Sequence, residues 1–314
     1  MEKSNNKIII LLMLISSIFW AGAFIGGKVA VVEFPPVSLT FLRFFIASIL
    51  IFITMVKFEK KNWRLKKEDL PVMIFLGLVG MVGYHILFFM ALKYTTAINA
   101  SMIAAINPLI TTLLSAIFLN EVLNIKRVGA VLIALSGVLL TITKGDLSII
   151  MSLSFNRGDV LMIFAVSCWA IYSIVSRRVM NRYSPLILTT YSFVLCALFT
   201  LPFAFMEKPL EFLPRTTYKG WLGVVYMAIF PSFIGYLVQQ TSIKKLGASK
   251  TAIFINLVPA FSMILSALIL KEEITLFTIF SGSLIVVGVY LTSRLKIIVK
   301  EKDLAEGINK GMVK

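Results

Sequence analysis

Long apolar runs separated by short polar segments extend along almost the whole chain. Most runs are about 20 residues long, which is the length that an α-helix needs to cross the hydrocarbon core of a bilayer. We therefore expect an all-α membrane protein with ten transmembrane helices. The predicted spans are residues 8–32, 36–56, 71–92, 98–119, 128–143, 159–176, 185–206, 218–240, 249–270 and 274–293.

Two of these runs share one internal pattern. Residues 98–121 read INASMIAAINPLITTLLSAIFLNE and residues 251–272 read TAIFINLVPAFSMILSALILKE, so each has an interior proline and a terminal glutamate. Similar matches recur at nearly constant spacing, which indicates two copies of one unit. Paired interrupted segments of this kind are the best sequence indication of a midplane binding site in a transporter. The matching pairs are Trp20 and Trp169, Pro36 and Pro185, Pro108 and Pro259, Ser115 and Ser266, and Glu121 and Glu272.

The duplication sets the domain organisation. We expect a first five-helix repeat at residues 1–144, a connector at 145–157, a second five-helix repeat at 158–294, and a cytoplasmic tail at 295–314. Because five is an odd number of spans, the second copy enters the bilayer from the side opposite to the first. The two repeats are therefore predicted to be inverted about a pseudo-two-fold axis in the membrane plane, an arrangement that suits alternating access.

The distribution of charge supports a membrane location and predicts an orientation. Hydrophobic residues make up 59% of the chain and charged residues only 15%, whereas a soluble domain carries about 25% charged residues. The net charge of +16 could indicate a nucleic-acid partner, but the basic residues lie in short loops beside the spans, so we expect none. Most of the 31 Lys and Arg residues fall on the same side of the membrane as the N-terminus. The positive-inside rule therefore predicts a cytoplasmic-membrane protein with both termini cytoplasmic.

Residues that could carry catalysis are scarce. His85 is the only histidine, and no acidic residue accompanies it in its own span. The sequence has no aspartate-rich motif and no pattern of metal ligands, so we expect neither an enzyme nor a metal or cofactor site. The two cysteines, Cys168 and Cys196, both fall within apolar runs, and we interpret them as free packing residues.

Short motifs recur in both copies. They are Trp20-Ala21, residues 36–43 (PVSLTFLR), residues 108–121 and Gly137 in the first copy, and Trp169-Ala170, Pro185, residues 259–272 and Gly288 in the second. Together they resemble the drug/metabolite transporter superfamily in its EamA branch, over nearly the whole chain. The resemblance implies ten helices in an inverted five-plus-five fold and the export of small metabolites or drugs. One departure is Arg43, because the second copy has Ser192 at the matching position.

Arg43 and His85 lie in the interior of predicted spans rather than at their ends. In the interior of a span, polar groups are costly and usually face a cavity or a neighbouring helix. Arg43 would anchor an anionic group such as a carboxylate, or it would be a structural arginine that bonds to backbone carbonyls or snorkels outward. His85, beside Tyr84, would carry a proton or make a hydrogen bond between helices. Because no Asp or Glu lies in mid-span, a carboxylate proton relay has little support, and the energy source stays open.

Amide side chains accompany both interior prolines. Asn99 and Asn107 lie on roughly one side of the fourth span, and Asn256 lies one turn before Pro259. A proline such as Pro108 removes a backbone donor and leaves a carbonyl free, so a nearby amide can satisfy the backbone or face a substrate. We keep both interpretations and treat the two prolines as candidate helix breaks.

Aromatic residues and a glutamine complete the cavity candidates. Tyr236 and Gln239 share one face of the eighth span, where they could line a pocket or mark the membrane interface. The other aromatic candidates could line a cavity, or serve in packing and in an interfacial belt. They are Trp20, Tyr84, Trp169 and Tyr172.

The sequence thus predicts a secondary transporter that moves a small organic metabolite or drug, with export of an amino acid or similar solute by alternating access as the leading hypothesis. An exchanger or importer for sugar phosphates or nucleotide sugars is the alternative within transport, although it would need more cavity cations than Arg43 supplies. A non-transporting membrane helper protein is the other alternative. The expected partners are a small-molecule substrate and the lipid bilayer, and the sequence leaves open whether the chain forms a homodimer.

Overall fold

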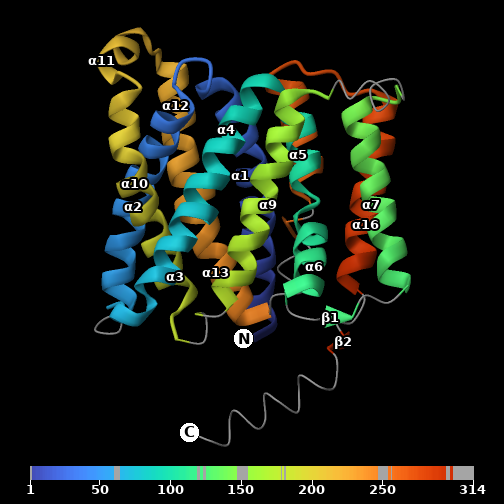
Figure 1. The fold of residues 1–314 in the computed structure, drawn as a ribbon, viewed down its shortest axis with the longest axis horizontal. Helices are drawn as coiled ribbons and strands as arrows, with labels where there is room; N and C mark the ends of the chain where they lie inside the picture. The colour runs from blue at the N-terminus through green and yellow to red at the C-terminus, as the bar shows by residue number, and fades with distance from the viewer. Residues whose placement is uncertain are drawn as a thin grey trace, which may run out of the picture.

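The computed structural model is a bundle of helices that lie roughly side by side (Figure 1). The residues that the structure describes are 2–59, 64–118, 121–122, 125–146, 155–177, 179, 182–246, 254–255, 257–294 and 298–299. The predicted cytoplasmic tail therefore lies mostly outside the described residues.

In the first half of the chain the helices are α1 (Glu2–Ala30), α2 (Pro36–Glu59), η1 (Lys67–Asp69), α3 (Leu70–Phe75), η2 (Leu76–Gly83), α4 (Tyr84–Tyr94), α5 (Ala97–Ala104), α6 (Asn107–Phe118) and α7 (Ile125–Thr143). In the second half they are α9 (Arg157–Arg177), α10 (Pro185–Met206), α11 (Pro209–Phe212), η3 (Leu213–Arg215), α12 (Tyr218–Met227), η4 (Ala228–Ile234), α13 (Gly235–Leu246), α15 (Val258–Ile269) and α16 (Leu276–Arg294). Two short strands, β1 (Glu121–Val122) and β2 (Ile298–Val299), pair antiparallel at one end of the bundle.

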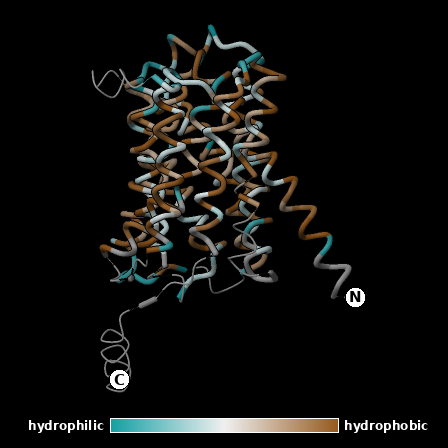
Figure 2. Tube along the Cα trace, turned by 90° about the vertical axis from the view of Figure 1, so that its right-hand side faces the viewer, coloured by the Kyte–Doolittle hydropathy of each residue, from teal (hydrophilic) through white to brown (hydrophobic). Residues whose placement is uncertain are grey.

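The apolar surface of the bundle identifies a multi-pass membrane protein. Hydrophobic residues fill its middle and hydrophilic residues gather at its two ends (Figure 2). Large apolar side chains face outward along the helices; for example, Ile53 on α2 is 61% exposed and Phe203 on α10 is 58% exposed. Side chains of this kind on the outside of a long helix are stable only in lipid or against a partner.

Six helical segments are long and apolar enough to cross a membrane, and each overlaps a predicted span. They are Lys7–Ala30, Pro36–Glu59, Lys67–Tyr94, Arg157–Ser176, Pro185–Met206 and Tyr218–Gln239. The other four predicted spans coincide with shorter apolar helices, at Ala97–Thr111, Val128–Thr143, Val258–Ile269 and Leu276–Leu291.

The helix that was predicted at residues 98–119 is divided into two. α5 ends at Ala104, and α6 begins at Asn107, so the break lies at residues 105 and 106, directly before Pro108. This is the expected place, because Pro108 has no backbone N–H to donate to the carbonyl of Ala104, four residues earlier, and its ring clashes with that carbonyl. In the second half, α15 has Pro259 in its first turn, where the missing backbone donor of proline costs nothing.

Two pairs of helices pack against each other along much of their length, namely α2 with α10 and α7 with α16. α1 packs on α12, η4, α13 and α15, whereas α9 packs on η2, α4, α5 and α6. Every one of these contacts brings the first half of the chain against the second. The interior therefore forms largely where the two halves meet.

Two long helical segments contain a turn of π-helix in their middle. η2 lies between α3 and α4, and η4 lies between α12 and α13. A π-turn inserts an extra residue into a helix and leaves backbone carbonyls poorly bonded, and such turns are frequent at functional sites. Both π-turns lie close to the side chains described next.

Candidate functional site

Six aromatic side chains form a closed circuit of ring contacts in the interior of the bundle. Its members are Phe44 (α2), His85 and Tyr84 (α4), Trp169 (α9), Tyr236 (α13) and Phe193 (α10), and we call this circuit the aromatic cage. The ring centroids of successive members lie 4.4 Å apart at the closest pair, Phe44 and His85, and 6.4 Å apart at the widest, Trp169 and Tyr236. The rings meet mostly edge to face or at an angle, which is the favourable geometry for aromatic contacts.

Arg43 lies against the aromatic cage. Its guanidinium carbon is 5.2 Å from the centroid of the Phe44 ring, and it is close enough to Tyr84 and Tyr236 to interact with them electrostatically. The residue is buried, with 5% of its surface exposed. Its Nε donates a hydrogen bond of 3.0 Å to the hydroxyl of Ser232 on η4. One cation therefore lies among aromatic rings supplied by five helices.

A nitrogen of a ring side chain supports each π-turn. Nδ1 of His85 lies 2.9 Å from the carbonyl oxygen of Met81 on η2, and because a carbonyl only accepts, the imidazole donates from Nδ1. On η4, the indole Nε1 of Trp20 donates a hydrogen bond of 3.1 Å to the carbonyl oxygen of Pro231. The bond from Trp20 occupies a carbonyl of η4, and the bond from His85 adds to the one that the Met81 carbonyl accepts from the backbone N–H of Tyr84. His85 and Trp20 thus hold the backbone beside the aromatic cage.

Tyr172 extends the aromatic cage toward η2. Its ring stacks on Trp169 with a centroid distance of 5.0 Å. Gly80 on η2 faces this ring so closely that a Cβ at position 80 would lie 2.1 Å from the ring atom Cδ2 of Tyr172. The glycine is therefore required for the close approach of η2 and α9.

Several predicted site residues lie away from the aromatic cage. Asn99 lies near the N-terminus of α5, where its side chain interacts with the carboxylate of Asp159. Asn107 accepts a hydrogen bond of 2.9 Å from the hydroxyl of Thr111 within α6, directly beside Pro108. Gln239 is partly buried on α13 and is not among the residues of the aromatic cage. Asn256 lies outside the described residues.

The structure brings together the candidates Trp20, Arg43, Tyr84, His85, Trp169, Tyr172 and Tyr236. Sequence reasoning did not identify Phe44, Phe193 and Ser232 as members of this region. Phe44 and Phe193 are ordinary apolar residues of apolar spans, and a single serine in a span has no distinguishing pattern. The position of Phe44 directly after Arg43 is the one local signal that could have found it.

A second concentration of polar contacts lies at the turn between α4 and α5, residues 94–98, which we call the α4–α5 turn. Lys28 on α1 donates hydrogen bonds of 2.6 Å to the carbonyl oxygens of Leu92 and Thr95. Asp159 on α9 accepts a hydrogen bond from the hydroxyl of Thr95. Glu272, which follows α15, accepts from the backbone N–H groups of Ala97 at 2.8 Å and Ile98 at 3.0 Å. Three charged side chains, from α1, from α9 and from the segment after α15, thus fix one turn.

Carboxylates also join α2 and α10 at both of their ends. At one end Glu207, which follows α10, accepts from the backbone N–H and the hydroxyl of Ser38 in the first turn of α2, both at 2.7 Å. At the other end Glu59, the last residue of α2, accepts from the hydroxyl of Ser184, the N-cap of α10. Negative groups at helix N-termini are stabilising because the backbone N–H groups there have no partner in the helix.

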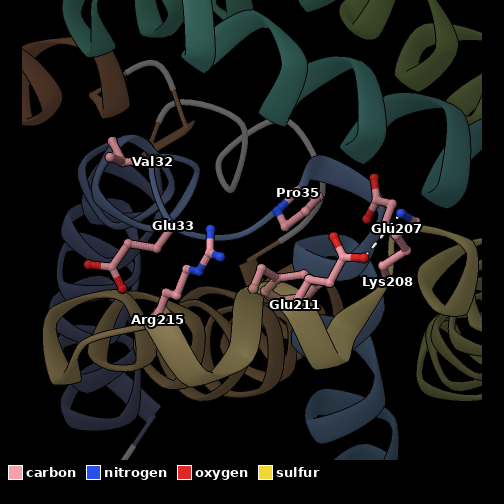
Figure 3. Close-up of a pocket in the computed structure, with 8 residues that line it drawn as sticks. Val32, Glu33, Pro35, Glu207, Lys208, Glu211 and Arg215 are labelled. Carbon is pink, nitrogen blue, oxygen red and sulfur yellow. Dashed lines mark ion pairs between the residues drawn. The ribbon is translucent and has the colours of Figure 1, made fainter.

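An open pocket of about 360 Å³ lies at the end of the bundle that carries α11 (Figure 3). Its carboxylates are already bonded: Glu33 accepts from the N–H and hydroxyl of Thr217, Glu207 caps α2, and Glu211 pairs with Lys208 at 3.1 Å. Glu33 and Glu207 therefore hold helix ends and Glu211 forms an exposed ion pair, while Arg215 also lines the pocket. The aromatic cage, with its buried cation, is the stronger candidate for a binding site.

Comparison with known proteins identifies the family. The model of the EamA-like transporter family matches residues 7–143 and again residues 156–294. An uncharacterized transporter of Bacillus subtilis, YyaM, is 35% identical over 287 residues, which cover 91% of this chain and 93% of the relative. An uncharacterized transporter of Archaeoglobus fulgidus is 31% identical over 289 residues, covering 90% and 96% of the two chains.

More distant proteins agree with this result. A probable terminal-alkyne amino-acid exporter of Streptantibioticus cattleyicolor is 22% identical over 282 residues, covering 90% of this chain and 92% of that one. A protein crystal structure with 21% identity matches the fold with a TM-score of 0.62, over 92% of this chain and 99% of that chain. The helical bundle, the apolar spans and the two family matches make this chain a member of the EamA-like transporter family, within the drug/metabolite transporter superfamily.

Proposed function

We propose that the protein is a secondary transporter that exports a small organic solute, an amino acid or a similar metabolite or drug, by alternating access. In this proposal ten helices form two inverted five-helix repeats, at residues 1–144 and 158–294, and the aromatic cage is the binding site between them. The observation that carries the proposal is the composition of this site. The first repeat supplies Arg43, Phe44, Tyr84 and His85, and the second supplies Trp169, Phe193 and Tyr236, so movement of one repeat against the other would open or close it.

Reciprocal contacts support the inverted arrangement. Glu207 caps the start of α2 and Glu59 bonds to the N-cap of α10, so these two helices run antiparallel with matching contacts at both ends. In an inverted repeat, the second and seventh spans are equivalent and antiparallel. The contact is of the isologous type, in which the same element of each unit binds its counterpart.

The contact between α7 and α16 is also one between equivalent helices of the two predicted repeats. A Cβ on Gly137 would lie 2.7 Å from the backbone oxygen of Ser281, and a Cβ on Gly288 would lie 2.7 Å from the backbone oxygen of Ala130. Gly137 and Gly288 are separated by the same number of positions as Ala130 and Ser281. Each glycine therefore allows close approach to the equivalent point of the other helix, as two-fold related units require.

The excess of basic residues beside the predicted inner ends of the spans supports an orientation with both termini in the cytoplasm, within the cytoplasmic membrane. The end of the bundle with α11 and the α4–α5 turn would then face outward. The name of the Streptantibioticus relative, a probable amino-acid exporter, supports the direction and the solute class. We assign the chain no catalytic role, no cofactor and no nucleic-acid partner.

Metabolite export by whole cells tests this proposal. The external medium of cells that express the protein is compared with that of cells that express Trp169→Ala, which removes the central ring of the aromatic cage. Trp221→Ala is the matched control, because Trp221 bonds to Thr216 outside the cage. At least one solute should accumulate outside wild-type and control cells and not outside Trp169→Ala cells. Identical media from all three, with each protein present in the membrane, would refute export.

Flux measurements distinguish export from the two alternative functions. An exchanger or importer of sugar phosphates or nucleotide sugars would take up a solute in the same cells in exchange for an internal one. A helper protein would produce no flux of any metabolite pool in proteoliposomes. A homodimer is compatible with either, and the molecular mass of the purified protein tests it.

A further inference from the structure

We propose, as an extension of the transport function above, that the guanidinium of Arg43 binds the carboxylate of the substrate. The substrate class is then a monocarboxylate with an apolar or aromatic body, and amino acids are members of this class. The site consists of Arg43 and Ser232 for the carboxylate and the aromatic cage for the body.

The charge of Arg43 lacks a counterion among the described residues. The residue is 5% exposed, so the side chain does not reach the surface by snorkelling. None of the ion pairs within the described residues includes Arg43. The ionisable groups that interact with it are Tyr236, Tyr84, Cys196 and His85, none of which is an anion at neutral pH. Because an isolated buried charge is costly, an anion from outside the protein is the natural partner.

The hydrogen bonds of the guanidinium also support an external anion as the partner of Arg43. Nε donates to the hydroxyl of Ser232, whereas neither Nη1 nor Nη2 has an acceptor within the part of the chain that the structure describes. Within the described residues, the two Nη groups are therefore available to donate to a ligand. Arg43 thus differs from a structural arginine, whose N–H groups bond to backbone carbonyls.

The geometry and the charge of the site favour a carboxylate over other anions. The two Nη groups form a planar fork that matches the two oxygens of a carboxylate. A phosphate would carry a second negative charge into a site with one cation. Two other cations of the first half do not supply the second positive charge that a phosphate would need. Lys28 is bonded to two carbonyls, and Lys93 lies exposed at the end of α4.

The aromatic cage suits the rest of such a molecule. Tyr84, Trp169 and Tyr236 offer ring faces and edges to an apolar or aromatic body. The same faces can accommodate an α-ammonium group by cation–π interaction, which requires no carboxylate from the protein. In the present conformation the rings contact one another, so binding requires that they separate, as the rocking of two repeats would allow.

Isothermal titration calorimetry of the full-length protein in detergent tests the proposal without any mutation. The probes are the proteinogenic amino acids and a series of aliphatic and aromatic monocarboxylates, each paired with its methyl ester and its amide, together with inorganic phosphate and chloride. At least one carboxylate should bind, and its ester and amide should bind about 100-fold more weakly, because they lose the charged bidentate contact. The proposal is overturned if no carboxylate binds, if an ester binds as well as its acid, or if phosphate or chloride binds equally well.

Variants of Arg43 provide an independent measurement. Arg43→Gln should bind the acid and its ester with affinities within a few-fold of each other, and Arg43→Lys should recover part of the preference for the acid. Lys93→Gln is the control, and it should retain the full preference. The inference would be refuted if the exported solute carries no carboxylate and the Arg43→Gln variant binds it as tightly as the wild-type protein does. The transport function would still stand in that case. Absence of any flux in the metabolite experiment would instead refute the function.

Discussion

Removal of the charge of Glu272 should loosen the end of the bundle that carries the α4–α5 turn, which faces outward in the proposed orientation. This carboxylate accepts from the N–H groups of Ala97 at 2.8 Å and Ile98 at 3.0 Å, at the start of α5. It belongs to the second half of the chain, whereas α5 belongs to the first, so the contact must break when the two halves separate on this side. Glu272→Gln keeps the shape of the side chain but removes its charge and one of its two acceptor oxygens.

The magnitude follows from the two bonds. A hydrogen bond to a charged group contributes about 1.5–3 kcal/mol, and a charge at a helix N-terminus contributes about 0.3–1 kcal/mol. Glutamine retains one acceptor, and the site is partly exposed, so we expect a net loss of about 2 kcal/mol from the closed state. This corresponds to an increase of about 30-fold in the ratio of open to closed molecules on this side.

Cysteine labelling measures this ratio. Ala100 is fully buried on α5, one turn beyond the capped N–H groups. In a protein whose native cysteines are replaced by alanine, Ala100→Cys should react with an external, membrane-impermeant maleimide about 30-fold faster when Glu272→Gln is present. Glu273→Gln is the control, since the neighbouring Glu273 is exposed. An unchanged labelling rate would refute the assignment of this contact to the outward gate, and labelling only from the cytoplasmic side would refute the orientation.

The remaining predictions concern the support of the aromatic cage. Gly80→Ala should lower the thermal unfolding temperature in detergent, because the new Cβ would meet the Tyr172 ring; we expect a destabilisation of about 1–3 kcal/mol. Gly129→Ala is the control and should not lower the unfolding temperature, because no atom lies within 4 Å of the Cβ that it adds. Trp20→Phe should destabilise by about 1 kcal/mol through loss of the bond to the Pro231 carbonyl. It should also reduce export more than its effect on unfolding accounts for, and equal export per folded molecule would contradict a role of this bond at the site.

Hydrophobic patterning predicted the membrane segments well because burial in lipid is a local requirement on each run. All six long segments overlap predicted spans, and the division of the fourth run lies where Pro108 indicates it. The ten-helix inverted arrangement stays a prediction that the reciprocal contacts of α2 with α10 support.

The π-turns could not be predicted, since residues 76–83 (LGLVGMVG) read as ordinary apolar helix. The indole of Trp20, which bonds to η4, comes from a helix far away in the chain, and no periodicity within η4 records that donor. The carboxylate caps escaped prediction for the same reason. Glu207 and Ser38 are far apart in the chain, and capping between helices leaves no local motif. Arg43 was recognised as unusual, but its lack of a carboxylate partner within the described residues required the fold.

The two π-turns lie directly before residues that line the aromatic cage: η2 ends at Gly83, before Tyr84 and His85, and η4 ends at Ile234, two residues before Tyr236. A turn that holds one surplus residue can tighten into regular α-helix, and each residue in an α-helix advances by about 100° around the axis. Such tightening would swing these rings away from Arg43 while the ends of both helices stayed in place. Two π-turns of this kind thus allow the rings of Tyr84, His85 and Tyr236 to rotate about their helix axes without any tilt of the whole bundle.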